Sequence, residues 1–126
     1  MRIVLVDDEE GIRASVRLLI ERRTTFEVVG EAADGLAAIE LVERLQPDVV
    51  VMDVQLPVLG GVEATLKIKE RWPHIYVLAF TADESACGDM LAAGASGYLL
   101  KGGGPDRIIY SLGTARTSTE RRLLQP

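Results

Sequence analysis

The chain has 126 residues and a mass of 13.7 kDa, with 48% hydrophobic and 26% charged residues, which fits one globular domain and excludes a disordered chain. Its net charge of −5 argues against direct binding to nucleic acid or an anionic membrane, and no apolar run approaches the ~18 residues of a membrane span. The single cysteine, Cys87, excludes an internal disulfide, and the chain enters its first strand without a charged leader, so we expect a cytoplasmic protein without a signal peptide.

Strand-like and helix-like segments alternate five times along the chain. We expect strands at residues 2–6, 26–30, from 49 to the carboxylate of Asp53, 75–80 and 97–100. We expect helices at residues 10–21, after the N-cap Asp34, after Gly60-Gly61, at 84–93 and from Pro105 onward. This alternation predicts an α/β fold with a parallel sheet that carries helices on both faces.

The last residues of the chain are polar and basic, with several threonines. We expect a domain over residues 1–113, and residues 114–126 either continue the last helix or form a linker toward an output domain not present in this chain. The residues after 113 are too few for a DNA-binding domain, which needs roughly 50 or more.

Acidic residues follow two of the predicted strands. The apolar run Val49–Met52 ends on Asp53 and then breaks at Pro57, and the first strand ends on Asp7 and Asp8. In parallel α/β sheets, binding sites form beyond the carboxyl ends of the strands. If these two strands are neighbours, three carboxylates meet at one point, which indicates a site and not an ordinary surface.

Two later strands add complementary groups at the same edge, since the fourth ends on Thr81 and the fifth on Lys101. Clustered carboxylates raise one another's pKa unless a cation intervenes, and all-oxygen ligands suit Mg²⁺. A divalent metal, an ammonium and a hydroxyl can hold the oxygens of a phosphoryl group in transfer. Asp53 is then the nucleophile that forms an acyl phosphate.

At this point the sequence resembles a known family, the response-regulator receiver domain of two-component signalling. The resemblance rests on the segments Val6-Asp7-Asp8-Glu9, Met52-Asp53-Val54-Gln55-Leu56-Pro57, Phe80-Thr81-Ala82 and Tyr98-Leu99-Leu100-Lys101, and it covers residues 2–113. The segment from Ala93 to Gly102 is most similar to the NarL-like (LuxR-type) subfamily. The resemblance implies a single doubly wound (βα)5 flavodoxin-like domain with a parallel five-stranded sheet in the order 2-1-3-4-5.

The resemblance also implies a role for each site residue. Asp53 would accept phosphate from a sensor histidine kinase, with Lys101 and Thr81 contacting the phosphoryl oxygens. The metal ligands of Mg²⁺ would be Asp8, Asp53, the backbone carbonyl of Gln55, and Asp7 through a water. No other cofactor is implied.

The implied output is a conformational switch. Thr81 would move inward toward the phosphoryl group and Tyr98 would turn into the vacated space, which changes the surface of the fourth helix, fifth strand and fifth helix. The implied partners are the kinase and a second copy of the chain on phosphorylation, with DNA bound only through an output domain outside this chain. The protein would be a phosphoacceptor switch that assists its own phosphorylation and dephosphorylation, not an ordinary enzyme.

The sequence departs from the family at two places. Gly102 follows Lys101 where receivers usually have proline, so we expect no cis bond there, and Gly60-Gly61 replaces a common Asp-Gly pair. Neither change affects a phosphoryl-contacting residue.

Other interpretations stay open. Taken singly, Asp7, Asp8 and Thr81 fit helix caps, Lys101 an exposed lysine and Tyr98 a partly buried aromatic residue. A stand-alone receiver acting through protein contacts is the first functional alternative. An aspartyl-phosphate phosphohydrolase or an FMN-binding protein fits less well, because the Asp-x-Asp-x-Thr motif and the Ser/Thr-rich phosphate loop are absent after the first strand.

Overall fold

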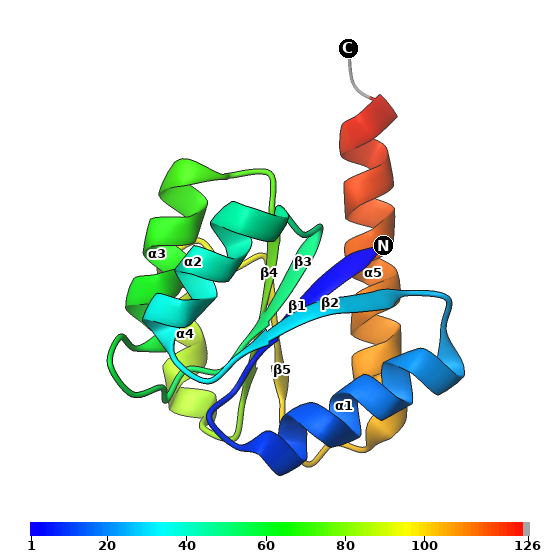
Figure 1. Ribbon diagram of the computed structural model, residues 1–126, viewed down its shortest axis with the longest axis horizontal. Helices are drawn as coiled ribbons and strands as arrows, with labels where there is room; N and C mark the ends of the chain where they lie inside the picture. The colour runs from blue at the N-terminus through cyan, green and yellow to red at the C-terminus, as the bar shows by residue number, and fades with distance from the viewer. Residues whose placement is uncertain (125–126) are drawn as a thin grey trace.

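The computed structural model describes residues 1–124 as a five-stranded sheet covered by helices on both faces (Figure 1). The strands are β1 (Arg2–Val6), β2 (Glu27–Ala32), β3 (Val49–Met52), β4 (Tyr76–Thr81) and β5 (Gly97–Leu100). The helices are α1 (Glu10–Arg23), α2 (Gly35–Leu45), α3 (Gly61–Arg71), α4 (Cys87–Ala92) and α5 (Pro105–Leu124), with a 3₁₀ turn, η1 (Glu84–Ala86), before α4.

The sheet is parallel throughout, in the order β2-β1-β3-β4-β5, which confirms the predicted flavodoxin-like fold. β1 and β3 pair with Ile3 opposite Val49 and Val6 opposite Met52, so their carboxyl ends are level. The backbone N–H of Asp53 continues this pairing by donating to the Val6 carbonyl at 3.0 Å. The register therefore brings the residues that follow β1 and β3 to the same edge.

Two apolar layers enclose the sheet. α2, α3 and α4 cover one face, and α1 and α5 cover the other (Figure 1). Val50 and Met52 point into the first layer, whereas Val49 and Val51 point into the second, and all four are buried. A strand with both faces buried has no position for a polar residue, which explains the unbroken apolar run that precedes Asp53.

The expected helices are confirmed with changes at their ends. Asp34 caps α2, because its Oδ1 accepts from the Ala37 N–H at 2.7 Å. The segment expected as one helix over 84–93 is instead η1 followed by the short α4. The Asp83 carboxylate caps η1 by accepting from the backbone N–H of Ser85, so the chain starts as a tight turn.

Two leucines that fit apolar faces of α2 and α3 by their helical spacing are only half buried, Leu36 at 48% exposed and Leu66 at 46%. The buried positions of α2 and α3 include the small residues Gly35, Ala38 and Ala64 beside Val42 and Ile68, and α2 approaches its neighbours closely. At Gly35, for example, a Cβ would lie 2.1 Å from the Leu59 carbonyl oxygen.

α5 continues past residue 113 to Leu124, whereas residues 125 and 126 of the expected tail lie outside the residues that the structure describes. Figure 1 shows its second half extending beyond the sheet. Ala115 is its last buried residue. Of the helices described, none combines the length and apolar character needed to cross a membrane.

Candidate functional site: an acidic cluster at the carboxyl edge of the sheet

Three carboxylates meet where β1 and β3 end. Asp7, Asp8 and Asp53 each place a carboxylate oxygen within 4.8 Å of the other two. Asp7 and Asp53 are buried and Asp8 is exposed. The level ends of β1 and β3 produce this arrangement, as the sequence predicted, and the cluster is one that can hold a metal ion.

Lys101 brings one positive charge to the cluster from the end of β5. Its ammonium donates to Asp7 Oδ2 at 2.6 Å and lies 3.3 Å from Asp53 Oδ2. The backbone N–H of Lys101 donates to the Thr81 carbonyl at 2.8 Å, which ties the end of β5 to that of β4. Burial lowers the pKa of Lys101, but the hydrogen bond to Asp7 and the charges of Asp53 and Asp7 outweigh it and raise that pKa above its usual value.

Burial makes the charged form of the Asp53 carboxyl less favourable than it is in water. Its burial raises the pKa of its carboxyl, Lys101 lowers it and the charge of Asp7 raises it again, so the net pKa lies above the usual value of 3.8. Oδ1 accepts from the Val54 N–H at 2.8 Å, and the side chain faces an open cavity although only 6% of the residue is exposed. A buried carboxylate with an incomplete set of partners is a strong attachment point for a cation or an electrophile.

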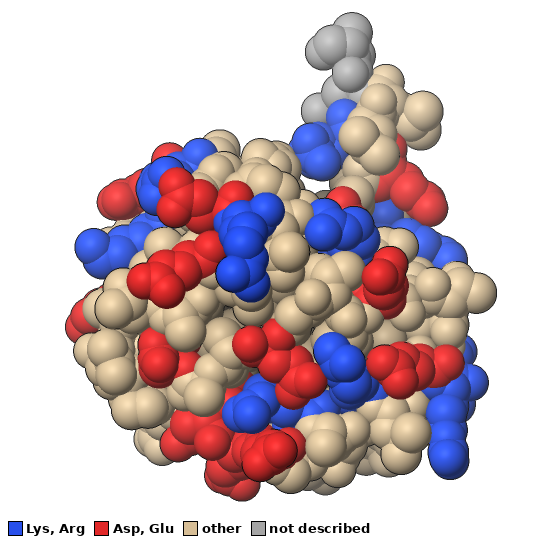
Figure 2. All heavy atoms as spheres, viewed as in Figure 1, with Lys and Arg blue, Asp and Glu red and all other residues tan. Residues whose placement is uncertain are grey.

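An open cavity of about 590 Å³ lies over the cluster. Its lining residues are Asp8, Glu9, Ile12, Asp53, Gln55, Thr81, Ala82, Asp83 and Lys101. Figure 2 shows acidic side chains gathered along the lower edge of the molecule, where the strands of Figure 1 end, with basic side chains beside them. The cavity is thus polar and open to solvent.

Six of the predicted site residues lie at the cavity or directly behind it. Asp8, Asp53, Gln55, Thr81 and Lys101 line the cavity together. Asp7 lies behind them. Its Oδ1 accepts from the Glu9 N–H at 2.9 Å and its Oδ2 from Lys101, an arrangement in keeping with an indirect contact to a metal.

Tyr98 does not line the cavity. It is 51% exposed, so it is less buried than the alternative interpretation as a partly buried aromatic residue expects. Thr81 is buried, and its Oγ1 accepts from the Asp83 N–H at 3.1 Å. Among residues 1–124, no hydrogen bond joins Thr81 to Asp53.

Two residues near the site were not anticipated. Arg13, from the first turns of α1, donates to the backbone carbonyl of Asp7 at 2.5 Å. The ring of Phe80 lies below the Lys101 ammonium, 5.5 Å from ring centroid to Nζ. Nothing in the sequence sets Arg13 apart from the other arginines of α1, whereas Phe80 is adjacent to Thr81 in a motif already singled out.

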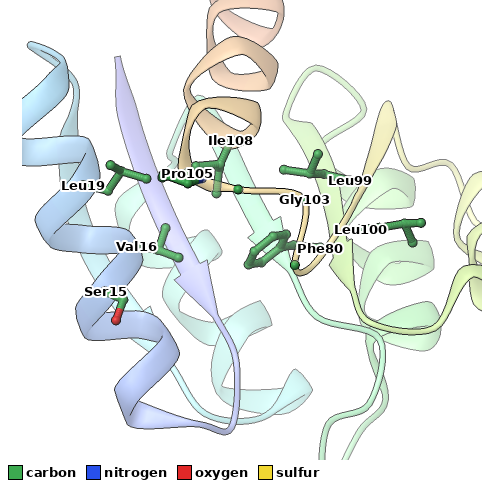
Figure 3. Close-up of a pocket in the computed structure, with 11 residues that line it drawn as sticks. Ser15, Val16, Leu19, Phe80, Leu99, Leu100, Gly103, Pro105 and Ile108 are labelled. Atoms are coloured by element: carbon green, nitrogen blue, oxygen red, sulfur yellow. The ribbon is translucent and has the colours of Figure 1, made fainter.

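A second cavity, of about 350 Å³, lies between α1 and the segment that joins β5 to α5 (Figure 3). Its walls are mostly apolar, with Val16 and Leu19 from α1 facing Phe80, Leu99 and Ile108. Within residues 1–124 its lining includes no charged side chain, so it lacks the carboxylates and the ammonium of the first cavity.

Comparison with known proteins identifies the fold family that this site belongs to. The family model described as the response regulator receiver domain matches residues 3–112. The transcriptional regulatory protein DegU of Brevibacillus brevis is 41% identical over 114 residues, which cover 89% of this chain and 48% of that protein.

Solved structures agree. A two-component response regulator of the LuxR family from Aurantimonas sp. SI85-9A1 superposes with a TM-score of 0.85 at 34% identity, covering 98% of each chain. The REC domain of AraT, a response regulator from Geobacillus stearothermophilus, gives a TM-score of 0.88 at 27% identity over 97% of each chain. The expected resemblance to NarL-like, LuxR-type receivers is confirmed.

The chain spans about half the length of the curated relatives it matches, 48% of DegU and 54% of the transcriptional regulatory protein LnrK of Bacillus subtilis. These relatives are named as transcriptional regulators and not as classical enzymes.

Proposed function

The chain belongs to the response-regulator receiver domain family, and on that premise we propose that it is a phosphorylation-activated signalling switch in which Asp53 accepts a phosphoryl group from a sensor histidine kinase. One observation carries the proposal: the Asp53 carboxylate faces an open cavity into which Asp8, Thr81 and Lys101 also project from three other strand ends. The nucleophile, the anion-binding groups and the metal ligands of phosphoryl transfer are therefore together.

The donor set fits Mg²⁺. Asp8 and Asp53 would bind it directly with the backbone carbonyl of Gln55, and Asp7 would act through a water, because both of its carboxylate oxygens already accept from Glu9 and Lys101. When bound, Mg²⁺ supplies positive charge that offsets the clustered carboxylates and the incoming phosphoryl oxygens. The ammonium of Lys101 alone cannot balance three carboxylates.

In the transfer step, an Asp53 oxygen attacks phosphorus while the bond from phosphorus to the histidine nitrogen breaks. The electron pair of that bond returns to the imidazole, so no general base is required at Asp53. Lys101 exchanges part of its contact with Asp7 for a phosphoryl oxygen, and the Thr81 hydroxyl donates to another. The open cavity gives the phosphohistidine access to Asp53.

The output step begins at Thr81. Its Oγ1 now accepts from the Asp83 N–H, and rotation toward the phosphoryl group breaks that bond and vacates space beside β4. Tyr98, now exposed, turns into that space. The surface of α4, β5 and α5 changes as a result and favours a homodimer.

A DNA-binding output domain outside this chain would then be regulated. The transcriptional regulators among the relatives are about twice as long as this chain, and α5 together with residues up to 126 would connect the receiver to that domain. A stand-alone receiver is the alternative, and sequencing the gene past Pro126 distinguishes the two. The expected cytoplasmic location stays a prediction.

The direct experiment is phosphorylation by acetyl phosphate, followed by intact-protein mass spectrometry. We expect one phosphoryl group per wild-type chain in the presence of Mg²⁺, and none with EDTA or in Asp53→Asn. Asp89→Asn, at an exposed aspartate of α4, is the matched control and should be labelled like wild type. Equal labelling of Asp53→Asn and wild type would contradict the proposal.

A further inference from the structure

Every polar group of Asp7 has a partner within the chain. Its N–H donates to the Ala32 carbonyl at 3.1 Å, its Oδ1 accepts from Glu9 and its Oδ2 from Lys101. The remaining group, the backbone carbonyl, accepts from Arg13 at 2.5 Å. Asp8, the next residue, differs: it is exposed, and within residues 1–124 its carboxylate makes no hydrogen bond or ion pair.

The Asp7 carbonyl belongs to the planar peptide unit that joins Asp7 to Asp8. Holding that oxygen fixes the orientation of the peptide plane, and with it the direction in which the Asp8 side chain leaves the backbone. Within residues 1–124 the Asp8 carboxylate has no hydrogen-bond or ion-pair partner, so the direction in which it points depends on the backbone. We infer that Arg13 is a positioning residue for the metal site, which aims the Asp8 carboxylate at the cation through the Asp7 carbonyl; this rests on the proposed function.

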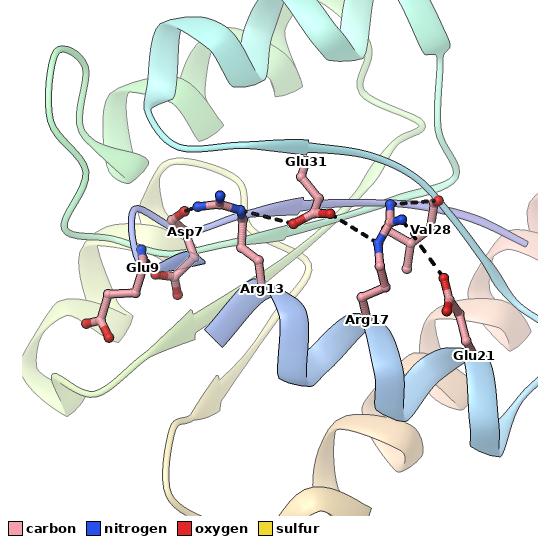
Figure 4. A network of polar contacts seen from close by, with 7 residues as sticks. All are labelled: Asp7, Glu9, Arg13, Arg17, Glu21, Val28 and Glu31. Carbon is pink, nitrogen blue, oxygen red and sulfur yellow. Dashed lines mark hydrogen bonds and ion pairs between the residues drawn. The ribbon is translucent and has the colours of Figure 1, made fainter. Parts of the chain in front are cut away.

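Arg13 is itself fixed on its far side. Its Nε donates to Glu31 Oε1 at 3.1 Å, so one guanidinium joins Glu31 of β2 to the Asp7 carbonyl that follows β1 (Figure 4). Only 15% of the Arg13 side chain is exposed. The planar guanidinium can hold two acceptors at a set angle, which a lysine ammonium at the end of a flexible stem cannot do.

Arg17, one turn later on α1, provides a natural comparison. Its Nε lies 3.1 Å from Glu31 Oε2, without hydrogen-bond alignment, and a terminal nitrogen donates to the Val28 carbonyl at 3.3 Å. Figure 4 shows both arginines reaching from α1 to Glu31, with only Arg13 continuing to Asp7. Arg17 therefore shares the charge, helix and partner of Arg13, but not its contact with the acidic cluster.

Two effects of Arg13 on Mg²⁺ oppose each other. Its positive charge disfavours a cation nearby, whereas its hydrogen bond positions a ligand. Glu31, which also pairs with Arg17, offsets part of the charge of Arg13 through the 3.1 Å ion pair, and we expect positioning to dominate. Groups that orient metal ligands from behind typically change metal affinity by about 10–100-fold when removed.

The test is a Mg²⁺ titration of the 126-residue chain, followed by NMR shifts of the backbone amides near the cluster. We expect about tenfold weaker binding for both Arg13→Gln and Arg13→Lys. Arg17→Gln should bind like wild type. In phosphorylation by acetyl phosphate, the Arg13 variants should need about tenfold more Mg²⁺ for half-maximal rate but reach the wild-type rate at saturation. Urea unfolding in EDTA checks that the variants remain folded at the titration temperature.

Three results would overturn the inference. Wild-type affinity in Arg13→Lys would mean that the geometry of the guanidinium does not position the ligand, and tighter binding in Arg13→Gln would mean that the charge of Arg13 opposing the cation dominates. Equal weakening in Arg17→Gln would mean a general effect of the network. If the wild-type chain itself bound no Mg²⁺, the proposed function would fail first, and the Arg13 variants would be unnecessary to show it.

Discussion

The Lys101 ammonium donates to Asp7 Oδ2 at 2.6 Å across 94 positions of sequence, and it is 0.7 Å farther from the nearest oxygen of Asp53 (3.3 − 2.6 Å). Asp7 therefore takes the stronger of the two contacts. The carboxylate that faces the cavity keeps the weaker one, so Asp53 stays available to a cation or a phosphoryl group.

Asp53→Asn should raise the free energy of unfolding at pH 7 without Mg²⁺. The pKa of Asp53 is raised in the folded chain, chiefly by burial. Protonation of the carboxyl therefore favours folding, and this contribution is fully present at pH values below 3.8, the pKa in the unfolded chain. That advantage is lost as pH rises through the folded pKa, and asparagine avoids the loss. Urea unfolding in EDTA at pH 4 and pH 7 should show a gain that is larger at pH 7. A less stable variant at pH 7, with Asp89→Asn unchanged, would show that the carboxylate stabilises the fold.

Lys101→Ala should slow phosphorylation by acetyl phosphate about a hundredfold, because it removes the ammonium that lies 3.3 Å from the Asp53 carboxylate. Circular dichroism should show the fold intact. Lys67→Ala, at an exposed lysine of α3, is the control and should react at the wild-type rate. A normal rate in Lys101→Ala would remove Lys101 from the transfer step.

Tyr98→Ala should leave phosphorylation unchanged and weaken the homodimer formed with phosphoryl mimics. The side chain is half exposed and lies outside the cavity, so it can affect the output surface without contacting the reacting atoms. Sedimentation with Mg²⁺ and beryllofluoride measures the dimer, and mass spectrometry measures labelling. Lost labelling with an intact fold would place Tyr98 in the transfer site instead.

Gly61→Ala should destabilise the chain by about 1–3 kcal/mol or more and displace Asp53. A Cβ on Gly61 would lie 1.9 Å from the Asp53 carbonyl oxygen and 2.8 Å from the Val54 Cα, both backbone atoms that cannot easily move. Gly60→Ala is the matched control, because its nearest neighbour would be the Val54 carbonyl oxygen at 3.9 Å. Urea unfolding of both variants gives the comparison, and equal stability would show that the β3–α3 loop adapts freely.

The sheet and the acidic cluster could be predicted because each depends on a pattern along the chain. The run Val49–Met52 marks a strand buried on both faces, and the residue that ends it lies at the carboxyl edge. Once the strands are parallel, Asp7, Thr81 and Lys101 follow to the same edge by the same reasoning.

What escaped prediction depends on contacts across the fold. Arg13 is one of several arginines on α1, and only the pairing of β2 beside β1 brings Glu31 within its reach. Leu36 and Leu66 fit a helical apolar face, but other residues of those helices, small and large, take the buried positions. Helical periodicity gives the face of a helix and not the distance to its neighbour.

Beryllofluoride binding in the presence of Mg²⁺ tests the central claim most directly, since it mimics an acyl phosphate on an aspartate. We predict saturable binding to the wild-type chain, with amide shifts around Asp53, Thr81 and Lys101, that is lost in Asp53→Asn and without Mg²⁺. Unaltered binding in Asp53→Asn, or shifts confined to another part of the molecule, would contradict the account.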